Sequence, residues 1–132
     1  MNIPEAVKEL ENLASTHSSD FKDCKDFLVH AYKLVGVTLP ENLYSNDIGE
    51  ASRKDFELVY PPYRAYDIAV FRSFTGEVRR HVGIMLDSRW LVHFLVPTIE
   101  GAKGQVARGE ITRDQFCNSL VHVGRYKGFE HR

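Results

Sequence analysis

The chain has 132 residues, a hydrophobic fraction of 43% and a charged fraction of 27%, which is typical of one globular domain with its own core. Its formal net charge of −1 gives no reason to expect nucleic acid or an anionic membrane surface as a partner. The first residues contain no basic segment followed by an apolar one, and no apolar run is long enough to cross a membrane. We therefore expect a single domain over residues 1–132, made in the cytoplasm without a signal peptide and not inserted in a membrane.

The first part of the chain predicts two helices. The segment Pro4–Ala14 carries apolar residues at helical spacing, and the polar stretch Thr16–Asp20 predicts a turn after it. The next segment again places apolar residues at steps of three and four, with Asp23 as the expected N-cap and Gly36 as the expected stop. Cys24 then lies on the first turn of this helix, on the side that faces the core, where the amide dipoles favour a thiolate.

The remainder predicts mainly strands. Leu39–Tyr63 is expected to be irregular with a short helix near Ser52–Leu58, and Ser73–Gly76 is expected to be a turn. Pro97–Gly109 is expected to be a loop, and Thr112–Leu120 a short helix. Short connections between the first three predicted strands indicate an antiparallel meander, and the whole outline is that of an α+β domain. The predicted strands are Asp67–Arg72, Arg80–Leu86, Trp90–Leu95 and Leu120–Tyr126.

Three residues in this outline could form a catalytic site. His81 opens one predicted strand and His93 lies near the end of the next, so the turn at 87–89 would place them on paired strands. A nucleophilic thiol needs a base, and the base needs a third group that orients its ring. Cys24, His81 and His93 could fill these three roles. The alternative is structural: a helix cysteine is often a small core residue, and His93 a half-buried strand histidine.

These residues and their neighbours resemble the NlpC-type cell-wall peptidases, a family of papain-like cysteine endopeptidases. The order of the blocks and the spacings between the cysteine and the two histidines agree with the family pattern, over roughly residues 20–95. Several ordered blocks are much more specific than any single one. The matching blocks are Asp23-Cys24, Phe27, Gly36–Pro40, Asp67–Phe71, His81–Leu86 and Val92-His93.

The resemblance implies a papain-like domain in which the nucleophile begins a helix that packs on an antiparallel sheet. It implies Cys24 as the nucleophile, His81 as its base and His93 as the polar third member. The implied reaction is hydrolysis of peptidoglycan stem peptides at the bond between γ-D-glutamate and the diamino acid. No metal and no cofactor are expected, because no Cys/His cluster has zinc spacing and no Gly-rich loop has phosphate-binding context.

The sequence also departs from the family pattern. Lys25-Asp26 replaces the usual Ser-Gly, residues 17–22 replace an aromatic and Trp-Gly-Gly segment, and Tyr66 replaces a glycine. The ending Val123–Tyr126 resembles that of NlpC-type proteins from bacteriophage tails, which implies other tail proteins as partners and the virion as the location. A second hypothesis therefore keeps the fold as a structural component of a phage tail with little or no catalysis.

The other cysteine and histidines receive different expectations. His122 repeats the His-Val-Gly tripeptide, but it lies far downstream of Cys24 and without the apolar continuation, so it is the weaker candidate for the base. His30 follows Cys24 by six residues, so we expect it on another helix face, at the surface or toward a partner. We expect Cys117 in the core, Cys24 partly exposed, and no disulfide between them.

Overall fold

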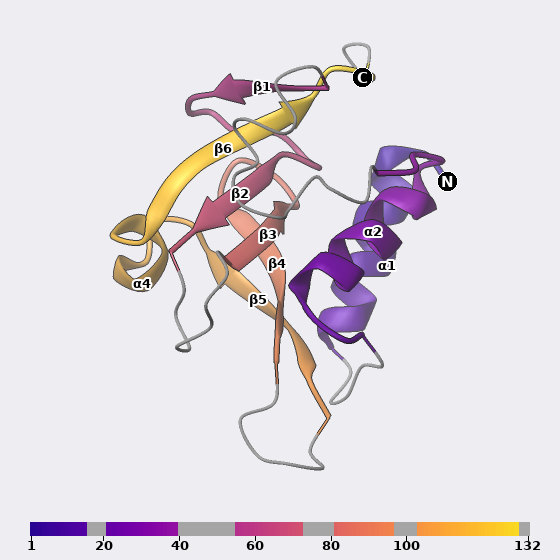
Figure 1. Cartoon of the computed structure of the whole chain (residues 1–132), viewed down its shortest axis with the longest axis horizontal. Coiled ribbons are helices and arrows are strands. Elements are labelled where there is room, and N and C mark those ends of the chain that lie inside the picture. Colours follow the sequence, from indigo (N-terminus) through magenta and orange to yellow (C-terminus); the bar gives the residue numbers. More distant parts are fainter. Residues whose placement is uncertain (16–20, 40–54, 73–80, 97–102, 130–132) are drawn as a thin grey trace.

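The computed structural model describes residues 1–15, 21–39, 55–72, 81–96 and 103–129. Two helices lie side by side on one face of a six-stranded antiparallel sheet, and a short helix lies on the far side of the sheet from them (Figure 1). This arrangement confirms the α+β class. Within the described ranges, every helix is too short or too polar to cross a membrane. The predicted turns Thr16–Asp20 and Ser73–Gly76 lie outside these ranges.

The two predicted N-terminal helices are present, and their caps explain where they begin. Helix α1 spans Ile3–Ala14, and its first turn is closed by a capping box between Asn2 and Glu5. Helix α2 spans Cys24–Leu34. As expected, Asp23 is its N-cap, with a carboxylate that accepts the Asp26 amide at 2.8 Å. Gly36, with a φ of 79°, follows its end.

The strands form one sheet in the order β1-β6-β2-β3-β4-β5. The predicted meander is confirmed, because β3 pairs antiparallel with both β2 and β4. The last described strand, β6, lies between β1 and β2 and pairs with both. These two strands are therefore joined by a segment that is far away in sequence. The strands are β1 (Phe56–Val59), β2 (Ile68–Phe71), β3 (His81–Met85), β4 (Trp90–Leu95), β5 (Gln105–Glu110) and β6 (Leu120–Tyr126).

Two predictions about these segments were wrong, and a third was right only for part of its range. The predicted loop Pro97–Gly109 contains most of β5, because Gln105–Glu110 pairs with β4 despite Gly109 and the charged residues. The predicted irregular stretch with a helix near Ser52–Leu58 contains β1, which forms because β6 offers it a partner. The predicted helix Thr112–Leu120 is reduced to α4 (Asp114–Cys117), since the chain turns into β6 directly afterwards.

Each face of the sheet carries its own hydrophobic cluster. The larger cluster, called here the helix-side cluster, lies between the sheet and helices α1 and α2. The smaller cluster, called the α4-side cluster, lies on the opposite face. The helix-side cluster comprises Ala6, Leu10, Cys24, Phe27, Leu28, Ala31, Tyr32, Leu39, Phe56, Tyr66, Ile68, Val70, Val82, Ile84, Leu86, Val92, Phe94 and Val106. The α4-side cluster comprises Ala69, Phe71, Met85, Leu91, Ile111, Phe116 and Val123.

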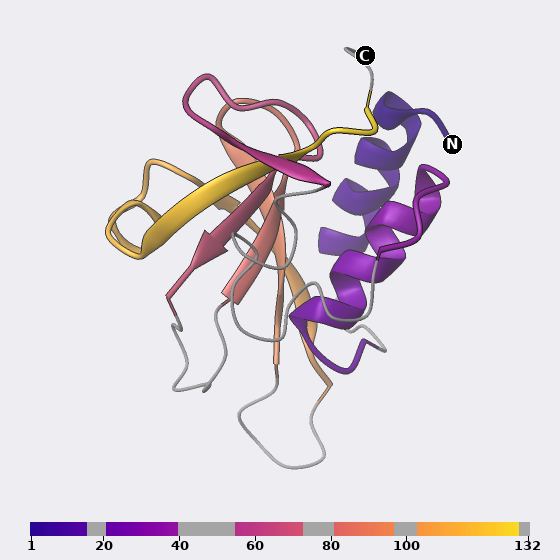
Figure 2. The same cartoon turned by 45° about the horizontal axis from the view of Figure 1, so that its top comes forward.

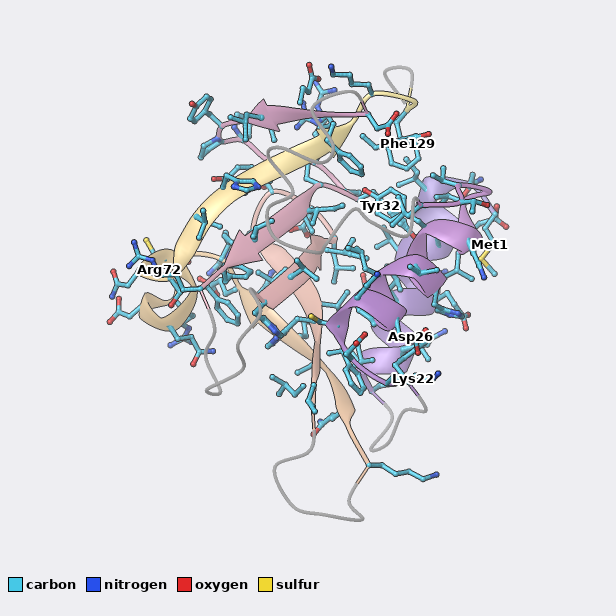
Figure 3. All side chains as sticks on the ribbon, in the orientation of Figure 1. Met1, Lys22, Asp26, Tyr32, Arg72 and Phe129 are labelled. Carbon is cyan, nitrogen blue, oxygen red and sulfur yellow. The ribbon has the colours of Figure 1, made fainter. Side chains whose placement is uncertain are left out.

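Aromatic rings fasten the C-terminal end of α2 to the sheet. The Tyr32 hydroxyl donates to the Tyr66 carbonyl oxygen at 2.7 Å, and the Tyr66 hydroxyl donates to the Ala31 carbonyl oxygen at 2.9 Å. Figure 3 shows Tyr32 beside Phe129 from the end of the chain, and the two rings stack at 5.7 Å. The turned view in Figure 2 shows α1 and α2 still together along one face of the sheet. These contacts fix the C-terminal end of α2 on the sheet. Because the helix is continuous, they also orient its first turn.

Candidate active site

Two buried imidazoles form the centre of the candidate site. His81 Nε2 lies 2.7 Å from His93 Nδ1, and the two rings meet edge to face at 4.9 Å. His81 is the first residue of β3, and His93 pairs with Gly83 two residues further along that strand. The contact is therefore a diagonal cross-strand pair, as the sequence predicted. We call His81 and His93 the imidazole pair.

The local sequence leaves room for this pair. Gly83 lies on the same face of β3 as His81, directly opposite His93. A Cβ atom at Gly83 would lie 3.1 Å from the Val92 carbonyl oxygen and 3.4 Å from the His93 Cβ. A larger residue would therefore push β4 away or displace the His93 ring. The His-Val-Gly tripeptide thus specifies one imidazole and the space for the second.

The imidazole pair is buried on the face of the α4-side cluster. His81 and His93 are only 4% and 5% exposed. Burial lowers the pKa of His81 to about 4. Burial, with a smaller contribution from the neighbouring His81, lowers the pKa of His93 to about 3. Both rings are therefore neutral at pH 7, and one nitrogen of the 2.7 Å contact donates while the other accepts.

Cys24 begins the helix that packs on the strands of the imidazole pair. It is the first residue of α2, and α2 contacts β3 and β4. Its side chain is 9% exposed and belongs to the helix-side cluster, so the expected partly exposed thiol is buried. Cys24 and the imidazole pair lie on opposite faces of the sheet, but His81 is the first residue of β3. A contact between Cys24 Sγ and the His81 ring would therefore be made at the end of the sheet where β3 begins. That contact stays a prediction.

A ring of hydrogen bonds holds the backbone around Cys24, and sequence reasoning missed it. Asp26 accepts the Lys22 amide through its carboxylate at 3.0 Å, while its own amide donates to Asp23. Figure 3 shows Lys22 and Asp26 at the first turn of α2. The capping pattern Asp-x-x-Asp is visible in the sequence and could have indicated this role. Asp26, one of the departures from the family pattern, therefore stabilises the turn that presents Cys24.

His122, His30 and the second cysteine lie elsewhere. His122 is on β6, and β2 separates it from β3, which places it about two strand spacings, or ~10 Å, from that strand. His30 is half-buried, with its ring 5.1 Å from that of Phe21. Cys117 was expected in the core, but it is exposed at the end of the short α4, where Phe116 takes the buried position. Neither cysteine forms a disulfide.

A bidentate ion pair joins the residue before β2 to β6. Asp67, which directly precedes β2, is 1% exposed and accepts two hydrogen bonds from Arg125 of β6, both at 2.8 Å. It also accepts the Arg64 amide at 2.8 Å. The pair joins residues that are 58 positions apart, so sequence reasoning singled out only the aspartate, in the block Asp67–Phe71. It joins the start of β2 to β6, on the side of β2 that faces away from β3.

No metal centre is found among the residues that the structure describes, where no group of three or more His, Cys, Asp or Glu side chains converges. Neither a family model nor a curated protein matches the chain. Since a fold class hosts many functions, the function has to be argued from the geometry of the site.

Proposed function

We propose that this protein is an NlpC-type, papain-like cysteine endopeptidase that hydrolyses peptidoglycan stem peptides between γ-D-glutamate and the diamino acid. One observation carries the proposal: a buried, 2.7 Å imidazole pair lies on the two strands against which the helix beginning at Cys24 packs. A thiol at a helix start, a base and an orienting group are the parts that thiol catalysis needs.

The contact between the imidazoles identifies the atom that would act as the base. His81 uses Nε2 toward His93, so Nδ1 is the ring nitrogen for the thiol proton. Nδ1 can accept only when the proton of neutral His81 resides on Nε2 and is donated to His93 Nδ1. His93 then selects the competent tautomer, which is the task of the third member of such a site. Burial keeps His81 neutral at pH 7, so the base is available there.

The proposed reaction has two steps. Cys24 Sγ attacks the carbonyl carbon while His81 Nδ1 takes the thiol proton, which is then given to the leaving amine as the C–N bond breaks and a thioester forms. Water, activated by His81, adds to the thioester, the C–S bond breaks, and the thiol regains its proton. The Cys24 amide lies at the start of α2, beside the attacking sulfur, and is the proposed donor to the oxyanion.

The backbone before β2 agrees with the proposed family. The family pattern has a glycine before the aspartate, and this chain has Tyr66. Tyr66 adopts a φ of 72°, in the left-handed region that glycine occupies without strain. A glycine would adopt this conformation without strain, so the backbone at Tyr66 supports the resemblance despite the substitution. The Tyr66 ring, 1% exposed, packs in the helix-side cluster and offsets that strain.

A turnover assay tests the proposal. The reduced wild-type protein is incubated with purified stem-peptide fragments of several chemotypes, and the products are identified by mass spectrometry. Cleavage at the γ-D-glutamyl bond is expected, and Cys24→Ala should abolish it. Cys117→Ala removes the exposed thiol and serves as the matched control, with wild-type turnover expected. Cleavage that survives in Cys24→Ala would refute the assignment of the nucleophile.

A second candidate function is that of a structural component of a phage tail. The side chains of Leu58 and Tyr60 at the β1 edge are 59% and 80% exposed, and Val121 on β6 is 38% exposed. Exposed apolar residues at a sheet edge suit contact with a neighbouring subunit in an assembly. A well-folded, reduced wild-type protein that is inert on every chemotype would favour this function over the enzyme.

A further inference from the structure

Two phenyl rings flank the imidazole pair on its buried face. The Phe116 ring lies 5.3 Å from the His93 ring at 88°, an edge-to-face arrangement. The Phe71 ring lies 5.5 Å from Phe116 and 6.4 Å from His81. Phe116 therefore covers one imidazole directly and contacts the ring that lies beside the other.

The position of Phe116 is determined by its surroundings. Its side chain is 1% exposed, and its ring rests on Gly109 of β5, where a Cβ atom would lie 2.5 Å from the phenyl Cζ. Its amide donates to the Arg113 carbonyl oxygen at 2.9 Å within the turn that forms α4. Gly109 and the single turn of α4 thus place the Phe116 ring against His93.

We propose that Phe116 is a positioning residue, whose ring closes the sheet face over His93 and keeps the two imidazoles neutral and in direct contact, which a base at His81 Nδ1 requires. Its importance for the reaction rests on the proposed function. Its effect on the two imidazoles does not, because it can be measured without turnover.

The Phe116 ring excludes water from the imidazole pair. Water at this face would offer donors and acceptors to both rings and would compete with the 2.7 Å contact between them. It would also stabilise a protonated His93, which can no longer accept through Nδ1. Burial is the main cause of the lowered pKa of His93, and Phe116 is part of the surface that buries it.

The test replaces the ring and observes the imidazoles by nitrogen-15 NMR between pH 7.5 and pH 5. At pH 5 about 1 in 100 wild-type molecules should carry a protonated His93, given its pKa of about 3. In Phe116→Ala the protonated fraction should rise at least about twentyfold, to roughly one in five or more. Phe116→Leu keeps an apolar cover and should restore most of the wild-type behaviour.

Phe94→Ala is the matched control. Phe94 follows His93 on β4, is equally buried and belongs to the helix-side cluster on the opposite face. Its truncation removes the same ring, but it should leave the His93 signals neutral at pH 5. If Phe116→Ala does not fold, Phe116→Gln introduces a polar group at the same place, and the same rise is expected.

The outcomes are separable. A His93 that stays neutral in Phe116→Ala or Phe116→Gln, or that titrates equally in Phe94→Ala, would overturn the proposal. In the turnover assay Phe116→Ala should lower kcat about tenfold with KM within about twofold of wild type, and Phe116→Leu should recover the rate. An inert wild type with the expected NMR shifts would refute the enzyme and leave the positioning effect standing. An active enzyme without those shifts would refute only the role of Phe116.

Discussion

Acid should destabilise this protein through His81 and His93, which are both buried. Each must be neutral in the folded state, since burial lowers the pKa of His81 to about 4 and that of His93 to about 3. In the unfolded chain both return to the ordinary value near 6.5. The unfolded state therefore binds more protons below pH 6.5. The stability contributed by neutral burial is complete above that pH and is lost as the pH falls toward the folded-state values.

The magnitude follows from the two sets of pKa values. Between pH 7 and pH 5, integration of the proton-binding difference gives about 2 kcal/mol for each histidine and about 4 kcal/mol for the imidazole pair. Such a loss is a large part of the total stability of a small domain. Replacement of one member of the pair should remove about half of the loss, or ~2 kcal/mol.

Urea unfolding, followed by the fluorescence of Trp90, measures this effect at pH 7 and at pH 5. The wild type is compared with His93→Gln, which removes one titrating ring and keeps a polar side chain. The free energy of unfolding of the variant should fall by ~2 kcal/mol less than that of the wild type over this range. His30→Gln removes an imidazole outside the pair and serves as the control for the change in histidine number.

One result would refute the reasoning. If the difference in unfolding free energy between wild type and His93→Gln changes by less than about 0.5 kcal/mol from pH 7 to pH 5, His93 is not held neutral by burial. The site would then be hydrated. Burial would then no longer explain how His81 is kept neutral as a base at pH 7.

Three further predictions concern the site and its support. His81→Ala should lower kcat/KM by about 10³-fold, nearly as much as Cys24→Ala, because nucleophile and base act as a unit, whereas His122→Ala should match the wild type. Alkylation followed by mass spectrometry at mildly acidic pH should label Cys24 ahead of Cys117, although Cys117 is the exposed thiol; preferential label on Cys117 there would contradict an activated Cys24. Asp67→Asn should lower the free energy of unfolding by about 3 kcal/mol, because it breaks a buried bidentate pair, and a loss below ~1 kcal/mol in urea titrations would contradict this.

The parts of the structure that follow local rules were predictable. The side chain of Asp87 accepts the amides of Arg89 and Trp90, both at 2.8 Å, which closes the turn that the sequence predicted. Because that turn is short, only one register is open to the two strands, and it brings His81 to His93. The central feature of the site therefore followed from turn chemistry and residue spacing.

The parts that depend on distant segments were not predictable. Strand β5 has a glycine and charged residues where strand formers are expected, and it forms because β4 offers a partner. The turn α4 was predicted as a longer helix with Cys117 inside. In the four-residue helix that forms, Phe116 is the residue that turns inward. A contact such as that of Phe116 with His93 depends on the tertiary arrangement, so no spacing rule could reveal it.

The place of β6 in the sheet has a consequence for how the protein is made. Among the described segments β6 is the last to be synthesised, yet it is the strand to which β1 pairs and the one that completes the outer side of β2. Until Leu120–Tyr126 emerges from the ribosome, the apolar residues of β1 have no strand beside them, and Asp67 lacks Arg125. Nascent chains that stop before this segment would expose an open strand edge, which favours association between chains. Completion of the sheet, and with it a protected imidazole pair, therefore waits for the synthesis of β6 and depends on contacts between distant parts of the sequence.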